Sequence, residues 1–463
     1  MKEKKKKTDH LLALIREGRP MTSGEQLRLT VALSVPAIVT QLSAIVMQYI
    51  DAAMVGSLGA NASASIGLVS TTTWLFWGLC AAASTGFSVQ VAHRIGADDW
   101  DCARSILRRS VPSTFAFSAL LAAIGVSVSG ALPQWLGGDS AIRSDASLYF
   151  LIFSLFLPIL QMNFLAAGML RCSGNMRIPS IAGILMCILD VVFNFFLIFP
   201  SREFSAGGLT LSIPGAGLGV QGAALGTGLA ESVAAAITLW YLFTRSSGLK
   251  IKAWRKSPSL PTPPIVRNSI RISLPMGLEH VVICGAQIMT TVIVAPLGIT
   301  AESLCYMPGY GIADAATTLV GQSLGAGRHR LTRRFAYITV FMGMVVMGIM
   351  GVVMYIFAPQ IIGTMTPVEE IRRLGVMALR IEAFAEPMFA AAIISYGVFV
   401  GAANTLVPSL MNFFSIWAVR ISLAAWLAPT MGLKGVWVAM CAELCFRGII
   451  FLIRLRGKRW MKI

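Results

Sequence analysis

Charged residues are scarce in this sequence: Asp, Glu, Lys and Arg make up 13% of its 463 residues, against 56% for the hydrophobic types. Soluble domains carry about 25% charged residues. Apolar runs of about 20 residues recur along the whole chain, and each can cross the hydrocarbon core of a bilayer, which is ~30 Å thick. The composition therefore excludes a soluble protein and indicates a polytopic membrane protein.

Residues that build enzyme and metal centres are also few. Histidine occurs only at positions 10, 93, 280 and 329, and the eight cysteines lack zinc or redox spacing. An intramembrane enzyme would need clustered nucleophiles, bases or metal ligands, and an ATP-driven pump would need a P-loop; neither pattern is present. We therefore expect no enzyme, no cofactor and no resident metal.

The apolar runs divide the chain into twelve predicted transmembrane helices, with no soluble domain between them. The approximate spans are 31–56, 65–92, 109–133, 146–171, 178–200, 215–243, 268–295, 300–323, 335–362, 371–400, 405–428 and 432–455. No small-residue cleavage site follows the first run, so we interpret that run as a retained helix and not as a signal peptide.

The net charge of +17 comes mainly from the loops on one side of the membrane. If the N-terminus is cytoplasmic, 30 Lys and Arg residues fall inside and two fall within helices. This asymmetry predicts a multi-pass protein of the cell membrane with both termini in the cytoplasm, where its basic segments contact anionic lipid and no nucleic acid. The remaining six basic residues fall outside or just beyond: Arg143, Arg202, Arg372, Arg373, Arg380 and Lys434.

The two halves of the chain repeat one pattern. An offset of 239 residues pairs Pro36 with Pro275, and an offset of 229 later pairs Pro158 with Pro387. Each half holds six helices, so the second copy enters the membrane in the same direction as the first, an arrangement typical of two-lobe transporters with alternating access. We divide the chain into a basic N-terminal segment (1–30), a first lobe (31–243), a cytoplasmic linker (244–267), a second lobe (268–455) and a basic tail (456–463).

Several motifs in order resemble those of the multidrug and toxic compound extrusion (MATE) transporters. They are "SVPAIVTQL" and "YIDAAMVGSLG" in the first helix, "GADD" after the second, "LRCSGNMRIPS" before the fifth, "LGVQGAALGT" opening the sixth and "TTLVGQSLGAG" closing the eighth. The resemblance runs from about residue 30 to residue 455. It implies an all-α fold of twelve helices in two pseudo-symmetric bundles of six.

The resemblance also implies a function. Members of the family are antiporters that expel organic cations or amphipathic compounds in exchange for H⁺ or Na⁺, and we expect this chain to act so as a monomer. A flippase for lipid-linked oligosaccharides or peptidoglycan precursors, from the same wider superfamily, is the alternative. A major-facilitator carrier fits less well, because "HRIGADDWDCAR" does not resemble its loop between helices two and three.

A carboxylate stands out in the first transmembrane helix. A charge at the bilayer centre costs roughly 2.5–3.5 kcal/mol, so it is rare unless it faces a polar cavity. Gln41, Gln48 and Asp51 lie on one polar stripe of this helix, which we expect to line the cleft. Asp51 follows Pro36 by 15 residues, a spacing similar to that of the family's first-helix aspartate, which binds protons or sodium.

The fifth helix carries Asp190 and Asn194 one turn apart. Family members with a developed cation site in the first lobe resemble this chain but have the order Asn then Asp. The exchanged order keeps a carboxylate and an amide near Asp51, a set of oxygen ligands suited to Na⁺ or to a shared proton. We expect these three residues to form the coupling site of the first lobe, with Asn163 lining the same cavity.

The second lobe offers weaker candidates for an ion or substrate site. Some family members carry a functional glutamate eight residues after the seventh-helix proline, where this chain has Ile283; Glu279 lies one turn earlier. Glu386, beside a proline in the tenth helix, and Glu382 are the other candidates. The seventh-to-eighth connection is ten residues shorter than its counterpart in the first half, which predicts asymmetry between the lobes.

A buried arginine in the eleventh helix, Arg420, needs an acidic partner. We expect that partner on a facing helix. Glu443 and Arg447, four residues apart in the twelfth helix, are predicted to pair with each other.

Overall fold

The computed structural model describes residues 2–206, 209–246, 248–254, 262–291, 297–365 and 369–461. The first lobe and its preceding segment contain the following elements: α1 (Lys2–Arg16), α2 (Ser23–Gly56), α3 (Ala60–Gly96), α4 (Trp100–Val128), α5 (Leu132–Trp135), α6 (Ser140–Cys172), α7 (Arg177–Ile198), β1 (Pro200–Ala206), β2 (Leu209–Ala216) and α8 (Gly219–Thr244).

The second lobe follows a short helix in the linker. Its elements, with that helix and the final turn, are α9 (Ile251–Trp254), α10 (Thr262–Thr291), α11 (Leu297–Gly325), α12 (His329–Met365), α13 (Glu369–Glu382), α14 (Glu386–Gly401), α15 (Leu406–Phe414), the π-helix η1 (Ser415–Arg420), α16 (Ile421–Met431), α17 (Leu433–Arg456) and the 3₁₀ turn η2 (Arg459–Met461). Parts of the 244–267 linker and of the seventh-to-eighth connection lie outside the described residues.

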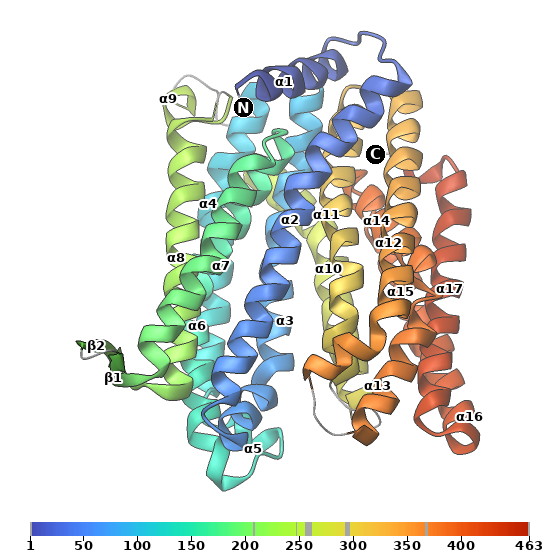
Figure 1. Cartoon of the computed structure of the whole chain (residues 1–463). Coiled ribbons are helices and arrows are strands. Elements are labelled where there is room, and N and C mark those ends of the chain that lie inside the picture. Colours follow the sequence, from blue (N-terminus) through green and yellow to red (C-terminus); the bar gives the residue numbers. More distant parts are fainter. Residues whose placement is uncertain are drawn as a thin grey trace.

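Within the described residues, nine helices are long and apolar enough to cross a membrane, and the pair α13 and α14 makes a tenth span bent by 62°. One of the nine runs through α15, η1 and α16 without a break. Helices α10 and α11 complete the two bundles of six, which stand side by side in Figure 1. The fold expected from the sequence, an all-α membrane protein of twelve spans, is confirmed.

Local sequence fixes where the helices of the first lobe begin. Thr22 and Glu25 form a capping box at the start of α2, where the Thr22 amide donates a 2.8 Å hydrogen bond to the Glu25 carboxylate. Asp99 accepts a hydrogen bond from the Cys102 amide in the first turn of α4, and Asp139 accepts one from the Ala141 amide in the first turn of α6. Each cap satisfies backbone N–H groups that have no partner within the helix, so each loop ends at a defined residue.

A two-stranded hairpin follows α7, where the sequence predicts only a loop. Strands β1 and β2 pair antiparallel, with Pro200 opposite Ala216, and the hairpin projects from the side of the first lobe (Figure 1). The guanidinium of Arg202 lies 3.9 Å from the centre of the Phe199 ring, which anchors the base of the hairpin to the end of α7.

Helix α1 lies across the end of the molecule that carries both termini (Figure 1). Leu11, Leu12 and Ile15 are buried in one cluster with residues of both lobes, among them Leu29 and Phe335. The Arg328 side chain donates a 2.9 Å hydrogen bond to the carbonyl oxygen of Leu14. The N-terminal segment is therefore a docked helix as well as a basic one.

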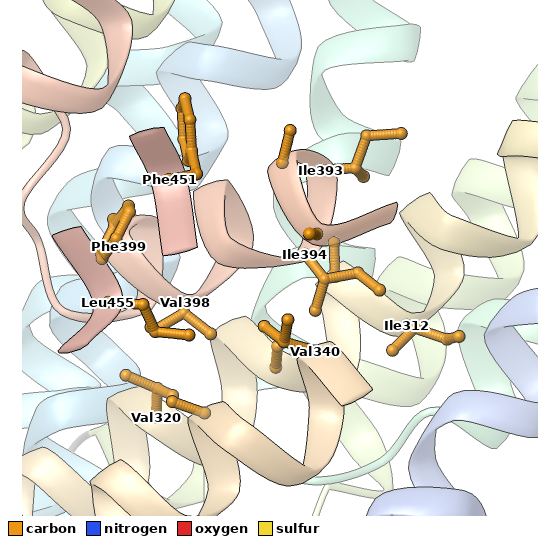
Figure 2. Packing of buried hydrophobic residues seen from close by; sticks show 14 of the residues in the cluster. Ile312, Val320, Val340, Ile393, Ile394, Val398, Phe399, Phe451 and Leu455 are labelled. Atoms are coloured by element: carbon orange, nitrogen blue, oxygen red, sulfur yellow. The ribbon is translucent and has the colours of Figure 1, made fainter. Parts of the chain in front are cut away.

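The second lobe has its core where α11, α12, α14 and α17 meet. Figure 2 shows the apolar side chains that these helices contribute, such as Ile312, Val340, Ile394 and Phe451. Their burial holds the lobe together as one rigid packing unit, because close-packed interiors resist continuous deformation. Movement is therefore expected between the lobes and not within this core.

The two lobes touch closely at the end that carries the termini. A side-chain carbon added to Gly96 on α3 would lie 2.0 Å from the carbonyl oxygen of Gln322 on α11, so only glycine allows this approach. The Gln322 amide donates a 2.6 Å hydrogen bond to the carbonyl oxygen of Cys172, and the His93 Nε2 lies 2.8 Å from that of Gly401. These contacts close the molecule at this end.

Candidate functional site

Two carboxylates and one amide meet in the first lobe. The Asn194 Nδ2 group donates a 2.9 Å hydrogen bond to Asp51 Oδ1 and a 3.1 Å hydrogen bond to Asp190 Oδ2. Asp190 and Asn194 are fully buried, whereas Asp51 is partly exposed. We call these three residues the carboxylate–amide cluster. The structure thus brings together the three residues that the sequence proposes for the coupling site.

Helix geometry explains how the cluster assembles. Asp190 and Asn194 are four residues apart, so both project from one face of α7, and that face packs against α2 near Asp51. On the opposite side, a side-chain carbon added to Gly226 of α8 would lie 2.0 Å from Asn194 Oδ1. Gly226 therefore lets α8 approach until its backbone fixes the position of the amide.

The cluster can hold a small cation or a proton. Two carboxylates so close to one amide repel each other unless a positive charge lies between them. The amide presents its NH₂ group to both acids, and its Oδ1 has no hydrogen-bond partner among the described residues. This orientation suits a pair of carboxyl groups that shares a proton, and reversal of the amide would add an oxygen ligand for Na⁺.

A second polar cluster lies in the same lobe, between α6 and α8. Asn163 on α6 donates a 2.7 Å hydrogen bond to Glu231 on α8 and accepts a 2.9 Å hydrogen bond from Thr238. Asn163 is thus the partner of a partly buried acid. The sequence analysis assigns no role to Glu231; its signal was a single acid in the middle of an otherwise apolar helix.

The two glutamines of α2 differ in exposure. Gln41 is partly exposed and Gln48 is exposed, and both precede Asp51 on the same helix. They have no part in the carboxylate–amide cluster, which receives its amide from Asn194 on α7. Both remain candidates for a cavity wall.

In the second lobe, Glu279 of α10 is surrounded by hydrogen-bond donors. Tyr396 of α14 donates to it at 2.5 Å, Ser409 of α15 at 2.8 Å and Asn412 of α15 at 2.5 Å. Glu279 is 9% exposed. Three donors from two other helices stabilise a buried carboxylate, so the residue ties α10 to α14 and α15.

Glu382 and Glu386 lie at the 62° bend between α13 and α14. Both are almost completely buried. A side-chain carbon added to Gly351 of α12 would lie 3.2 Å from the Cβ of Glu386. Glu386 therefore packs against α12. This placement favours a role for Glu382 and Glu386 at the bend over a role beside Glu279.

Arg420 of the eleventh span, which is partly exposed, has the acidic partner that the sequence predicts. Arg420 approaches Glu443 of α17 to 2.7 Å, and Arg447 approaches the other oxygen of the same carboxylate to 2.6 Å. Ser415 donates a further 2.5 Å hydrogen bond to Glu443. Ser415 and Arg420 are the first and last residues of the π-helix η1, which the sequence analysis did not predict.

No group of three or more His, Cys, Asp or Glu side chains in the described part of the chain is arranged to hold a metal ion. The carboxylate–amide cluster contains two acids and one amide, so it does not count as such a group.

Comparison with known proteins places the chain in a family. The sequence profile of the MatE family matches residues 36–196 and 282–426. The "Probable multidrug resistance protein NorM" of Thermotoga maritima is 24% identical over 449 residues, covering 93% of this chain and 92% of that protein. The same name is borne by a relative in Deinococcus radiodurans, 25% identical over 457 residues, covering 94% of this chain and 97% of that protein.

Solved structures agree with the profile. A crystal structure of a MATE protein superposes with a TM-score of 0.85 at 20% identity, covering 96% of this chain and 97% of the other. This likeness supports the same twelve-helix fold. The family profile covers more than half of the length of this chain. The chain therefore belongs to the MatE family, a family of membrane transporters.

Proposed function

We propose that this chain is a secondary active multidrug efflux antiporter. It exports organic cations or amphipathic compounds in exchange for H⁺ or Na⁺ by alternating access. The observation that carries the proposal is the carboxylate–amide cluster, in which Asn194 bridges Asp51 and Asp190. A fully buried acid beside a partly exposed one within a transmembrane lobe is costly to maintain, which supports a functional role.

Ion coupling would work through helix α2. This helix carries Asp51 and packs against α7 within its own lobe. Near Ile38 it also packs against α11 of the other lobe, where a carbon added to Gly311 would lie 2.7 Å from the Ile38 nitrogen. Loading Asp51 changes its attraction to Asn194, so α2 can transmit that change to the contact between the lobes.

The closed contacts at the terminal end fit one stage of such a cycle. With both termini in the cytoplasm, as the distribution of Lys and Arg suggests, this conformation is closed to the cytoplasm. Protons or Na⁺ would then reach Asp51 from outside, and substrate would leave on the same side. The chain would reside in the cell membrane and act as a monomer.

Aromatic side chains at the lobe boundary support the substrate class. Trp74 and Trp77 are both 41% exposed and stack with ring centres 5.8 Å apart. Trp77 lies 4.9 Å from the ring of Phe164, and Trp74 lies 6.2 Å from His280 of the second lobe. Exposed aromatic faces attract organic cations through their ring quadrupoles. The names of the relatives, which refer to multidrug resistance, agree with such substrates.

The test is efflux of a fluorescent organic cation from proteoliposomes, with a proton gradient and a sodium gradient imposed separately. We expect one of the two gradients to drive efflux, which would also identify the coupling ion. If neither gradient moves the cation, the antiporter proposal fails and a flippase for lipid-linked precursors becomes the leading alternative.

A further inference from the structure

A basic groove lies between α12, α13 and α17. It has a volume of about 840 Å³ and includes Arg372, Arg373, Arg380 and Lys434 in its wall. Glu369 is the one acid among its lining residues in the described part of the chain. The groove lies toward the end of the molecule opposite both termini, where α13 appears in Figure 1.

These four basic residues lie together on the side of the membrane where the sequence predicts few Lys and Arg residues. The topology expected from the sequence places six Lys and Arg residues outside or just beyond, and four of those six line this one groove. The other two, Arg143 and Arg202, lie in the first lobe. Basic residues are avoided on the outer side of membrane proteins, so their concentration in a groove needs a specific cause.

The helices place the cations in an ordered row. Arg372, Val376 and Arg380 recur every four residues, so they share one face of α13. Eight residues of helix separate the two arginines by about 12 Å along the axis. Lys434, in the first turn of α17, lines the same groove. The positive charge therefore extends along the groove from its outer end towards the membrane interior.

Little negative charge within the groove neutralises this row. Arg372 approaches Glu369 to 3.5 Å, but the Glu369 side chain is 87% exposed, so the pair is weak. Arg380 lies over the ring of Tyr355, with its Cζ 5.3 Å from the ring centre. Arg373 and Lys434 have no ion pair within the described residues. Guanidinium groups prefer a phosphate as partner, to which they bind in two-pronged fashion.

Apolar residues surround the groove on its outer face. Tyr355 is 42% exposed, Phe384 is 72% exposed, and the neighbouring Ile356 is 58% exposed. A rim of large exposed apolar side chains on a membrane protein is suited to contact with acyl chains. The groove therefore offers both a cationic wall and an apolar rim, and its ligand should have both an anionic head and an apolar body.

We propose that this groove binds one anionic phospholipid of the outer leaflet. Its phosphate would contact Arg372, Arg373 and Lys434, and its glycerol and upper acyl chains would lie along Val376 and Phe384. Basic pockets between transmembrane helices bind acidic lipid headgroups through the same chemistry. This site is separate from the carboxylate–amide cluster of the first lobe and does not depend on the transport proposal.

The experiment measures lipid binding to the purified full-length protein by native mass spectrometry. The protein is titrated with phosphatidylglycerol, with phosphatidylcholine, and with water-soluble glycerol 3-phosphate. Each cation near a bilayer surface contributes about a fivefold change in affinity for anionic lipid. We therefore expect one phosphatidylglycerol molecule to bind at least tenfold more tightly than phosphatidylcholine, and glycerol 3-phosphate to bind far more weakly.

Two variants test the location of the site. Substituting Arg372→Gln, Arg373→Gln and Arg380→Gln together should abolish the preference, and the matched control Arg143→Gln with Arg202→Gln should keep it. Lys434 is exposed, so Lys434→Gln should spare the fold and lower the affinity about fivefold even if the triple variant unfolds.

Three results would overturn the proposal. One is equal binding of the two lipids by the unmodified protein. Another is an unchanged preference in the Lys434→Gln and triple variants. The third is binding of glycerol 3-phosphate as tight as that of the lipid, which would show a small-anion site.

Discussion

The Asn194 side-chain amide donates a 2.9 Å hydrogen bond to the Asp51 carboxylate and so joins α7 to α2. The same nitrogen also donates to Asp190, so one amide orients two acids. The proposed coupling therefore depends on the order of Asp190 and Asn194 in the fifth transmembrane helix.

Removing the bridge should uncouple transport. Asn194→Ala deletes both hydrogen bonds and leaves the two acids without their shared donor. Since hydrogen bonds to charged groups contribute about 1.5–3 kcal/mol, we expect ion-driven efflux to fall by at least about tenfold. The measurement is efflux from proteoliposomes. Ser43→Ala, which removes a hydroxyl that bonds to the Val39 carbonyl within the same helix as Asp51, serves as control and should keep more than half of the activity.

Gly226, which packs against Asn194, should be required for stability and for efflux. Gly226→Ala would place a carbon 2.0 Å from Asn194 Oδ1, so α8 or the amide must move. Overpacking of this kind costs about 1–3 kcal/mol, and we expect a lower unfolding temperature together with reduced efflux. Gly67→Ala on α3 meets no atom within 4 Å, so that variant should be as stable as the parent. Equal stability of the two variants would contradict the packing argument.

The acid shared by two arginines should be essential for stability. Glu443→Ala would remove the carboxylate that the buried Arg447 and the partly exposed Arg420 share. Breaking a buried ion pair in this way costs about 3–5 kcal/mol. Thermal unfolding in detergent should show a large drop for Glu443→Ala and almost none for Glu369→Ala, which removes an exposed carboxylate. A small drop for Glu443→Ala would mean that the arginines find other partners.

The contact between the lobes should control access from the terminal end. Gln322→Leu removes the hydrogen bond to the Cys172 carbonyl, and the Cys172 side chain is 3% exposed. We expect a thiol reagent to label Cys172 several-fold faster in this variant, measured in a background with the other seven cysteines replaced.

Ser323→Ala is the matched control for that measurement, because the hydrogen bond that its hydroxyl makes in the described part of the chain, to the Val320 carbonyl, lies within the same helix. The control should label at the rate of the parent protein. Equal rates in Gln322→Leu and Ser323→Ala would show that the hydrogen bond does not hold the lobes closed.

The sequence predicts the fold well because apolar length and internal repetition are strong signals in membrane proteins. The twelve spans follow from them, and Arg420 was expected to have an acidic partner because an isolated buried charge is costly. The proximity of Asp51 to the Asp190 and Asn194 pair was expected from the resemblance to a family. Their role in coupling remains a prediction.

Other features depend on contacts between distant parts of the chain. Glu231 finds its donor Asn163 on a helix that lies 68 residues earlier, and no local pattern marks that pair. The basic character of the N-terminal segment obscured the apolar face formed by Leu11, Leu12 and Ile15. The groove lined by Arg372 and Lys434 appears only when α13 and α17 pack together.

The most direct test of the central proposal compares Asp51→Asn with the parent protein in proteoliposomes, following organic-cation efflux and the internal pH or sodium concentration together. We predict that the variant inserts and folds normally but loses efflux driven by the ion gradient, together with the accompanying movement of the ion. Retention of full ion-driven efflux by Asp51→Asn would contradict the account.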